Sequence, residues 1–341
     1  MGKIRTAVVG AGKMGAIHAK IYSELLESDL VAVVDIDAKK ARSLANKHRC
    51  SAYTTCTSIL GKVDAVTIAA PTVNHAELAK LFIENETPVM IEKPLAANIV
   101  ESREIVALAE RKNVVAAVGH SERCNPVVQA MKRLDIEPMF IEAHRISPYP
   151  FRSTDIGVVL DVMIHDIDII LSMAQSPIVK IDAAAVSVLD EKEDICNARI
   201  VFENGCIANV TASRLALKTE RKVRVFSRQA YLSLDYLKKT GKVVKADLNE
   251  DVIEKVRNLK KGSKLDLLKV NWLDLVHVEE LDIDDREPLR VEQEAFLRAV
   301  ADSTQKPEVS VEEGLAAMEC AELVLAAVKK HSWEYKPAMS T

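Results

Sequence analysis

Short apolar runs alternate with amphipathic segments along the first third of the chain. The runs of strand length cover residues 4–9, 30–34, 65–69, 89–91 and 114–118, and the segments with helical spacing cover 14–26, 74–86 and 99–111. Strands that alternate with helices in this way pair in parallel, because each helix carries the chain back across the sheet. The pattern therefore predicts a doubly wound parallel sheet.

The pattern changes after Gly119. Two apolar runs at residues 198–202 and 206–210 flank Glu203-Asn204-Gly205, and Asn-Gly between such runs is a strong signal for an antiparallel hairpin. We also interpret residues 179–189, 222–227 and 231–235 as strands and residues 158–173 and 311–330 as helices, whereas the polar segment 238–262 predicts no element. We expect this part of the chain to contain a large, mostly antiparallel sheet.

A chain of 341 residues is long enough for two domains of about 150 residues each. We expect an α/β protein with an N-terminal Rossmann domain at residues 1–120. Residues 121–341 then form an α+β domain for substrate binding and oligomerisation, whose C-terminal helices are able to pack back on the Rossmann domain.

A glycine-rich turn connects the first predicted strand to the first predicted helix. Its sequence, Gly10-Ala11-Gly12-Lys13-Met14-Gly15, fits a pattern in which the glycines allow a tight turn, close approach of a pyrophosphate and close helix packing. Asp35 lies about twenty residues further on, where a carboxylate accepts hydrogen bonds from ribose hydroxyls. A second acid, Asp37, would repel a 2′-phosphate. The segment predicts an NAD site, while strict preference over NADP stays open.

The loop after the run at 65–69 is a second candidate for cofactor contact. Pro71, Thr72, Asn74 and His75 lie where the chain should pass beneath the nicotinamide ribose. The alternative role of Thr72 and Asn74 is to cap the helix that follows.

The composition disfavours several other classes of function. The net charge of −4 is spread without a block of like charges, so no nucleic-acid or membrane surface is predicted. No run reaches the roughly 18 apolar residues of a membrane span, and the chain enters a strand directly without a secretion signal, so we expect a cytoplasmic protein. The six cysteines form no CxxC pair or Cys-His cluster, which predicts reduced, mostly buried thiols and no metal site.

Two short motifs carry groups suited to proton transfer. Glu92-Lys93-Pro94 follows the run at 89–91, at the carboxyl end of the sheet, where such folds bind ligands. Asp161 and His165 are four residues apart on a predicted helix, a spacing that places them on one face. Each motif alone is more typical of a solvated surface. Behind a dinucleotide-binding turn, the two motifs together favour a functional role over a solvated surface.

With Gly10-x-Gly12-x-x-Gly15-x-x-His18, these motifs resemble the Gfo/Idh/MocA family of glucose–fructose oxidoreductases, inositol dehydrogenases and rhizopine catabolism proteins. The resemblance covers nearly the whole chain, and the motifs occur in the family's order. It implies NAD-dependent oxidation of a sugar hydroxyl, with Lys93 and His165 as the catalytic pair, both near the substrate. Asp161, which shares a helix face with His165, is a further candidate for catalysis and substrate contact, and Glu92 and Lys93 are candidates for cofactor contact. Which of Lys93 and His165 is the general base stays open.

Residues 119–126, Gly-His-Ser-Glu-Arg-Cys-Asn-Pro, resemble the branch of this family that oxidises the 3-hydroxyl of UDP-N-acetylglucosamine. That resemblance implies a 3-keto product and a pyridoxal-phosphate-dependent aminotransferase as pathway partner. The diphosphate of a UDP-sugar favours guanidinium groups, for which Arg123, Arg145 and Arg152 are candidates, with Arg123 preferred. The family commonly assembles through the outer face of its antiparallel sheet, which implies a homodimer or homotetramer.

Three other functions stay open. A dehydrogenase of free sugars or inositols would need no arginine contact with a diphosphate. A glycosidase of the same fold would use NAD for transient oxidation and release no net NADH. A regulator that binds dinucleotide without chemistry is disfavoured by the intact Lys93, Asp161 and His165.

Overall fold

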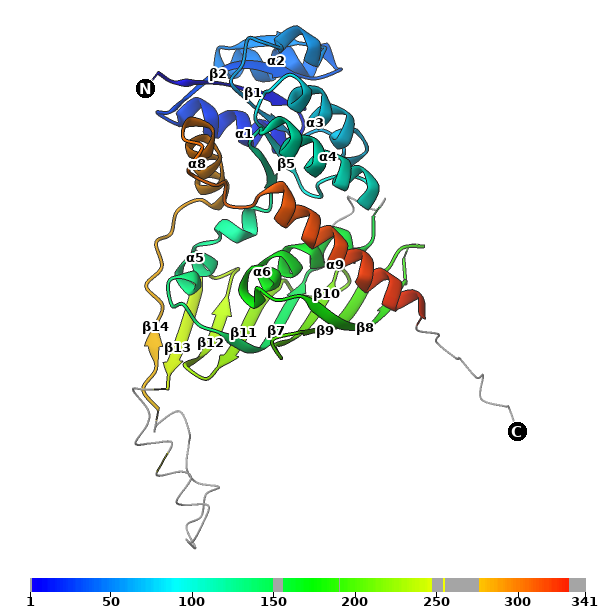
Figure 1. Cartoon of the computed structure of the whole chain (residues 1–341), viewed down its shortest axis with the longest axis vertical. Helices are drawn as coiled ribbons and strands as arrows, with labels where there is room; N and C mark the ends of the chain where they lie inside the picture. The colour runs from blue at the N-terminus through cyan, green and yellow to red at the C-terminus, as the bar shows by residue number, and fades with distance from the viewer. Residues whose placement is uncertain (1, 150–155, 190, 247–253, 255–275, 331–341) are drawn as a thin grey trace, which may run out of the picture. The chain divides into compact units, whose positions relative to one another are not determined.

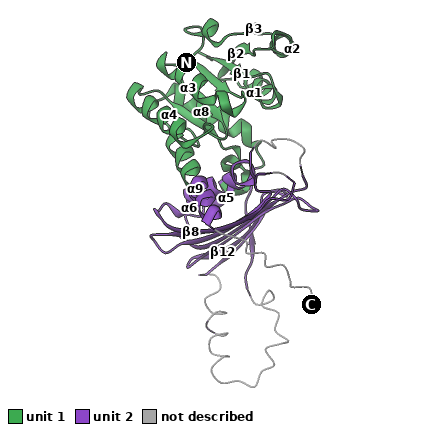
Figure 2. Ribbon diagram, turned by 90° about the vertical axis from the view of Figure 1, so that its right-hand side faces the viewer, with its two compact units in different colours: residues 1–128, 285–320 green, residues 129–284, 321–341 purple. Residues whose placement is uncertain are grey.

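The protein is described from a computed structural model, which describes residues 2–149, 156–189, 191–246, 254 and 276–330. The chain divides into two compact units (Figure 2). Unit 1 comprises residues 1–128 and 285–320, and unit 2 comprises residues 129–284 and 321–341. The division differs from a single cut at residue 120, because a segment from near the end of the chain belongs to unit 1.

Unit 1 is built on a six-stranded sheet (Figure 1). Its strands are β1 (Ile4–Val9), β2 (Ser28–Val34), β3 (Ser51–Tyr53), β4 (Ala65–Ile68), β5 (Val89–Glu92) and β6 (Ala116–Gly119). They follow the order β3-β2-β1-β4-β5-β6, and all of their pairings are parallel. This is the strand order of the Rossmann fold, which reverses direction between β1 and β4. The predicted doubly wound sheet is confirmed.

Helices between these strands cover the sheet. They are α1 (Lys13–Glu24), α2 (Ala38–His48), α3 (His75–Glu84) and α4 (Ile99–Lys112), with short 3₁₀ turns at Cys56–Ile59, Thr72–Asn74 and Ser121–Cys124. The four residues of β4 are all buried, as expected for a parallel strand covered on both faces. The apolar runs that we predicted to be strands therefore form the centre of the unit 1 core.

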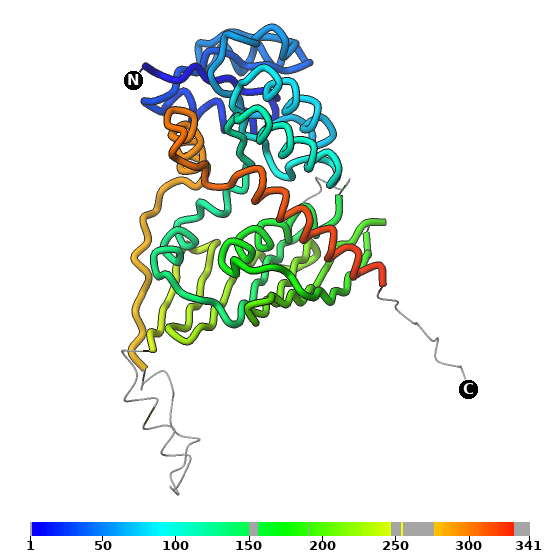
Figure 3. Tube along the Cα trace, viewed as in Figure 1, coloured from blue at the N-terminus to red at the C-terminus, as the bar shows by residue number. Residues whose placement is uncertain are grey.

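The end of the chain completes unit 1. Helix α8 (Pro288–Ala301), which the sequence pattern did not predict, buries Leu289, Phe296 and Leu297 in one cluster with Tyr22 of α1. Figure 3 shows α8, in orange, beside α1, in blue. The Val118 N–H of β6 donates to the Val309 carbonyl just before α9 (Val311–Lys330). Residues from both ends of the sequence thus share this core.

Unit 2 is built on an eight-stranded sheet of order β14-β13-β12-β11-β7-β10-β9-β8. The strands are β7 (Pro138–Ile146), β8 (Ile178–Val186), β9 (Ile195–Phe202), β10 (Ile207–Ser213), β11 (Glu220–Ser227), β12 (Ala230–Asp235), β13 (Thr240–Lys245) and β14 (Glu279–Glu280). Only β7 and β10 pair in parallel. Its helices are α5 (Pro126–Lys132), a π turn (Val159–Met163) and α6 (Ile164–Ala174). The expected mostly antiparallel sheet is confirmed.

The hairpin predicted at Glu203-Asn204-Gly205 joins β9 to β10. Gly205 has a φ of +86°, a conformation that glycine adopts without the steric cost of a Cβ atom. The pattern did not identify β7, and it gave no element for β13, which lies in the unassigned segment 238–262. Most of the remainder of that segment falls outside the described residues.

Candidate functional site

The glycine loop after β1 has the geometry that its sequence pattern requires. Gly10 has a φ of +99°, and a Cβ atom there would lie 2.5 Å from the carbonyl oxygen of Ala69. A Cβ atom on Gly15 would lie only 1.7 Å from the carbonyl oxygen of Gly10, because α1 packs directly against the loop. Contacts within the protein thus require glycine at positions 10 and 15, because a side chain there would clash with backbone atoms.

Gly12 differs from the other two glycines. A Cβ atom at this position would meet no protein atom within 4 Å, so its surroundings are open. Gly12 is also the N-cap of α1 and supplies no side-chain cap, while Lys13 and Met14 begin the helix and are exposed. Unpaired N–H groups and the dipole of a helix N-terminus attract phosphate. The loop therefore fits the pyrophosphate of a dinucleotide.

Asp35 is oriented by the same loop. One carboxylate oxygen accepts from the Ala11 N–H at 2.7 Å, and the other accepts from the Asp37 N–H at 2.8 Å. Each oxygen keeps a second lone pair, which a ribose hydroxyl can use. Asp37 caps α2 through the N–H groups of Lys39 and Lys40, and these bonds hold the pKa of Asp37 below its usual value. Asp37 thus has a capping role that its sequence position alone did not reveal.

The loop after β4 presents the next predicted cofactor residues. Pro71 and Asn74 are exposed and Thr72 is partly exposed. Asn74 makes no side-chain capping bond to α3, so the capping alternative is absent at this residue. His75 is 1% exposed, and its two ring nitrogens lie 2.9 Å from the carbonyl oxygens of Ala70 and Pro94. These contacts favour a structural role for His75, joining this loop to the one that carries Lys93.

Lys93 follows directly on the last residue of β5, Glu92. The Glu92 carboxylate contacts His18 of α1 through Oε1 at 2.8 Å and accepts from the Lys93 N–H through Oε2 at 3.2 Å. Burial raises the pKa of Glu92, but the hydrogen bond from His18 and the nearby charge of Lys93 outweigh it, so this pKa lies below its usual range. An ionised carboxylate therefore sits beside the partly exposed Lys93.

Asp161 and His165 belong to unit 2 and are both partly exposed. The structure confirms a helix here, but Asp161 lies in the π turn and His165 in the first turn of α6. Single π turns inside helices are frequent at functional sites. Just before the turn, Gly157 leaves room for Glu193, whose carboxylate accepts from the Val159 N–H at 3.1 Å.

The structure describes two of the three arginines considered for a diphosphate. Arg123 is 4% exposed, and its Nη1 donates to Glu313 at 3.0 Å. Arg145 lies in β7, where it makes two hydrogen bonds to the buried carboxylate of Asp166 at 2.9 and 2.7 Å. Both guanidinium groups are enclosed in ion pairs, which argues against direct contact with a diphosphate. Arg152 lies outside the described residues.

Buried ion pairs near the predicted site were not evident from sequence. Asp166, the partner of Arg145, directly follows His165. Asp194 and Arg214 form a second pair in which both side chains are almost fully buried, and Arg214 also donates to the Ile156 carbonyl. The one sequence signal that could have indicated these pairs is a charged residue within a mostly apolar helix, as at Asp166, because a buried charge needs a partner.

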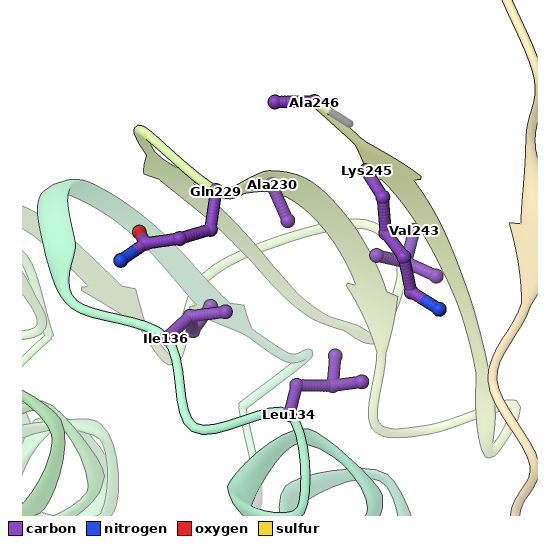
Figure 4. Close-up of a pocket in the computed structure, with 7 residues that line it drawn as sticks. All are labelled: Leu134, Ile136, Gln229, Ala230, Val243, Lys245 and Ala246. Atoms are coloured by element: carbon purple, nitrogen blue, oxygen red, sulfur yellow. The ribbon is translucent and has the colours of Figure 1, made fainter. Parts of the chain in front are cut away.

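A pocket of about 370 Å³ in unit 2 is separate from all predicted site residues (Figure 4). Its lining comes from the segment after α5 and from β12, β13 and their flanking loops. The lining residues are Leu134, Ile136, Gln229, Ala230, Val243, Lys245 and Ala246. The titratable side chain among them is that of Lys245, which pairs with Glu279 at 2.8 Å, so the lining carries no cluster of groups like that expected for the predicted chemistry.

None of the six cysteines forms a disulfide; four are buried and two are partly buried, so the expected burial of most of them is confirmed. Burial raises the pKa of Cys50, Cys56 and Cys206 to about 11, which makes these thiols unreactive.

In the described part of the chain, no helix combines the length and apolar character that crossing a membrane requires.

Comparison with known protein families matches both units. Residues 4–120 match the model described as "Oxidoreductase family, NAD-binding Rossmann fold", and residues 139–233 match the model "GFO/IDH/MocA C-terminal domain". The UDP-N-acetylglucosamine 3-dehydrogenase of Acidithiobacillus ferrooxidans is 34% identical over 238 residues, which cover 70% of this chain and 75% of that protein. An inositol 2-dehydrogenase of Rubrobacter xylanophilus is 32% identical over 49% of this chain and 51% of its own.

The solved structures give the same result. The UDP-N-acetylglucosamine 3-dehydrogenase structure from Acidithiobacillus ferrooxidans superposes with a TM-score of 0.84 at 29% identity, covering 97% of this chain and 99% of that chain. A levoglucosan dehydrogenase with NADH and levoglucosan shares the fold at a TM-score of 0.81 and 17% identity, covering 97% of this chain and 98% of its own. The chain is therefore an oxidoreductase of the Gfo/Idh/MocA family, with an NAD-binding Rossmann domain.

Proposed function

We propose that this oxidoreductase oxidises the 3-hydroxyl of UDP-N-acetylglucosamine with NAD, giving the 3-keto nucleotide sugar. The observation that carries the proposal is the 34% identity to an enzyme of that activity, over three quarters of its length. The segment 119–126 supports it through its resemblance to the same branch. The product is a ketone, so the reaction class that would consume it is transamination by a pyridoxal-phosphate enzyme.

The reaction converts a secondary alcohol to a ketone and releases one proton. NAD, when bound, accepts the hydride from the carbon that carries the hydroxyl. The protein's task is to hold that hydroxyl and take its proton, and Lys93 and His165 are the groups we assign to this task. Asp161 precedes His165 by one helical turn and is suited to orient or stabilise its imidazole.

The surroundings of Lys93 support its assignment. It lies at the carboxyl end of β5, next but one to β1 and the glycine loop in the sheet order. In open α/β sheets, ligands bind outside the carboxyl ends of the strands near the reversal of strand order. The partly exposed Lys93 also follows directly on Glu92, whose carboxylate accepts from the Lys93 N–H at 3.2 Å, so the backbone of Lys93 is held at the end of the strand.

A dehydrogenase of free sugars or inositols is the second candidate. One structural observation favours it: Arg123, the arginine preferred for a diphosphate, is buried in an ion pair with Glu313. Inositol dehydrogenases are also among the relatives of this chain. The two candidates share the catalytic residues and differ only in the substrate, so one set of assays separates them.

The test is a coupled assay with purified protein. NAD and UDP-N-acetylglucosamine are supplied together with a glutamate-dependent aminotransferase that removes the ketone, because oxidation of an alcohol by NAD is unfavourable at equilibrium, and NADH absorbance is followed. We expect steady NADH formation that requires the nucleotide sugar. The Lys93→Ala variant should lose turnover while still binding NADH, whereas Lys80→Ala, a surface lysine paired with Glu104, should match the wild type.

Other outcomes would redirect the assignment. NADH formation with inositols or free hexoses, and none with the nucleotide sugar, would keep the family and replace the substrate. Absence of NADH with all of these compounds would favour a glycosidase, which regenerates NAD in each cycle, or a regulator. Full turnover in Lys93→Ala would remove Lys93 from the mechanism.

We also propose that the protein self-associates through the outer face of the unit 2 sheet. This is the face that carries Phe226, and the buried side chains of Val223 and Val225 lie on the other face. Phe226 on this face is 39% exposed and contacts Phe140 edge-on and Tyr231 at a tilt, with ring centroids 6.0 and 4.8 Å away. Exposed aromatic clusters are typical of protein interfaces. Light scattering after gel filtration should show a dimer or tetramer, and Phe226→Glu should shift it toward the monomer; a wild-type monomer would contradict the proposal.

A further inference from the structure

A chain of buried polar groups leads away from Lys93 into the core of unit 1. It begins at Glu92 and continues to His18 of α1, whose side chain is fully buried. It ends at Gln293 of α8, which is also fully buried. The three residues come from distant parts of the sequence, and the mechanism proposed for Lys93 does not yet account for His18 or Gln293.

The contacts of Gln293 indicate which groups donate and which accept along this chain. Its Nε2 lies 2.9 Å from His18 Nδ1 and 3.3 Å from the backbone oxygen of His18. A backbone oxygen only accepts, so the amide nitrogen must point toward His18 and donate. Its second hydrogen then reaches Nδ1, which acts as the acceptor. In this arrangement a neutral imidazole carries its proton on Nε2, which lies 2.8 Å from Glu92 Oε1.

This arrangement keeps the Glu92 carboxylate in its acceptor form. One oxygen accepts from His18 Nε2, and the other accepts from the Lys93 N–H. A buried carboxylate without donors would take up a proton to avoid the cost of desolvation. The pKa of Glu92 lies below its usual range despite burial, and the hydrogen bond from His18 is the largest of the causes that lower it.

We propose that Gln293, acting through His18, holds Glu92 ionised beside Lys93, so that Gln293 and His18 are positioning residues for the proton chemistry of Lys93. The proposal rests on the role assigned to Lys93 in the proposed function. The other titratable groups in this buried region are Tyr22 of α1 and Glu292 of α8, both buried. Burial and the charge of Glu292 raise the pKa of Tyr22, which therefore stays neutral throughout the working range.

The proposal predicts how the reactivity of Lys93 changes when the chain is broken. In His18→Leu, Glu92 loses its donor and protonates more readily, so Lys93 loses an adjacent negative charge. The amine of Lys93 is then deprotonated in a larger fraction of molecules at a given pH. In Gln293→Met, the imidazole is free to turn its lone pair toward Glu92, which gives a smaller effect in the same direction.

The test measures labelling of Lys93 by an amine-selective reagent, followed by mass spectrometry of its peptide, in protein without sugar substrate. At mildly alkaline pH we expect the Lys93 rate to rise about 3- to 10-fold in His18→Leu and about 2- to 5-fold in Gln293→Met, corresponding to shifts below about one pH unit. His18→Gln keeps an N–H near the Nε2 position and should stay within about twofold of wild type. Lys80, exposed and paired with Glu104, serves as the internal reference.

The outcomes separate positioning from simple support of the fold. A rise at Lys93 with an unchanged Lys80 rate and recovery in His18→Gln supports the proposal. Equal rates in all four proteins overturn it, as does a parallel rise at both lysines, which would report loosening of unit 1. If His18→Leu does not fold, the comparison of Gln293→Met with His18→Gln gives the same decision. Because labelling needs no substrate, failure of the nucleotide-sugar assay leaves this test intact.

Discussion

The backbone N–H of Ala11 donates to the carboxylate of Asp35 at 2.7 Å, so the glycine loop and the end of β2 hold each other in place. Two carboxylate lone pairs remain for the hydroxyls of an adenosine ribose. Asp35→Asn should therefore weaken NADH binding about 10- to 100-fold, the range expected for hydrogen bonds to a charged group. Fluorescence titration with NADH measures this change.

The control for Asp35 is Asp29→Asn, which removes the same charge from an exposed position of β2. It should leave the NADH dissociation constant within about twofold of the wild-type value. Equal binding by Asp35→Asn and the wild type would show that this carboxylate does not contact the cofactor.

The glycines of the loop should respond differently to alanine. Gly12→Ala places a methyl group in open space, so the melting temperature should stay near that of the wild type while NADH affinity falls at least about tenfold, equivalent to about 1.4 kcal/mol. Gly15→Ala places a methyl group against the Gly10 carbonyl and should lower the melting temperature itself. Thermal melts and NADH titrations on both variants test the contrast; tight NADH binding by Gly12→Ala would contradict it.

Breaking the ion pair of Arg145 and Asp166 should destabilise the protein strongly. Both side chains are nearly fully buried, and loss of one partner leaves an uncompensated charge that costs about 3–5 kcal/mol. Arg145→Ala should therefore unfold at much lower urea concentration. Arg224→Ala, which removes an exposed arginine paired with Glu142, should cost about 1 kcal/mol or less. Similar losses in the two variants would contradict this view of the buried pair.

Asp194 should contribute to stability in a pH-dependent way. Burial alone would raise the pKa of Asp194. The hydrogen bonds from the N–H groups of Leu189 and Val188 and from Arg214 together outweigh burial, so this pKa lies below its usual value. A carboxyl whose pKa is depressed in the folded state stabilises that state above its ordinary value of 3.8, and this stabilisation is lost as pH falls through the folded value. Wild type should thus lose stability steeply on acidification.

The Asp194→Asn variant should be less stable at neutral pH and show a smaller decrease in melting temperature between about pH 5 and pH 3. Asp182→Asn, an exposed position on β8, should keep the wild-type slope. Parallel pH profiles for Asp194→Asn and the wild type would indicate that Asp194 does not titrate differently on unfolding.

The sequence by itself determined those features that depend on local periodicity and on backbone conformation. Most strands of the unit 1 sheet, the Gly10 to Gly15 turn and the Asn204-Gly205 hairpin were predicted, because each is defined by residues close together in the sequence, whereas β7 and β13 were missed. Glycine at a positive φ and apolar residues at fixed spacing act locally, so a pattern can detect them. The position of Lys93 at a strand's carboxyl end follows from the same reasoning.

Only the tertiary structure decided which distant side chains meet. Gln293 is identified as a partner of His18 by the packing of α8 on α1, and nothing in its local sequence distinguishes it from a surface glutamine. The sequence suggested Arg123 and Arg145 as ligands of a diphosphate. In the folded protein their side chains are buried in ion pairs with Glu313 and Asp166. Burial removes water from a charged group, so its partner must come from whichever element packs there. That partner is a property of the fold and not of the neighbouring sequence.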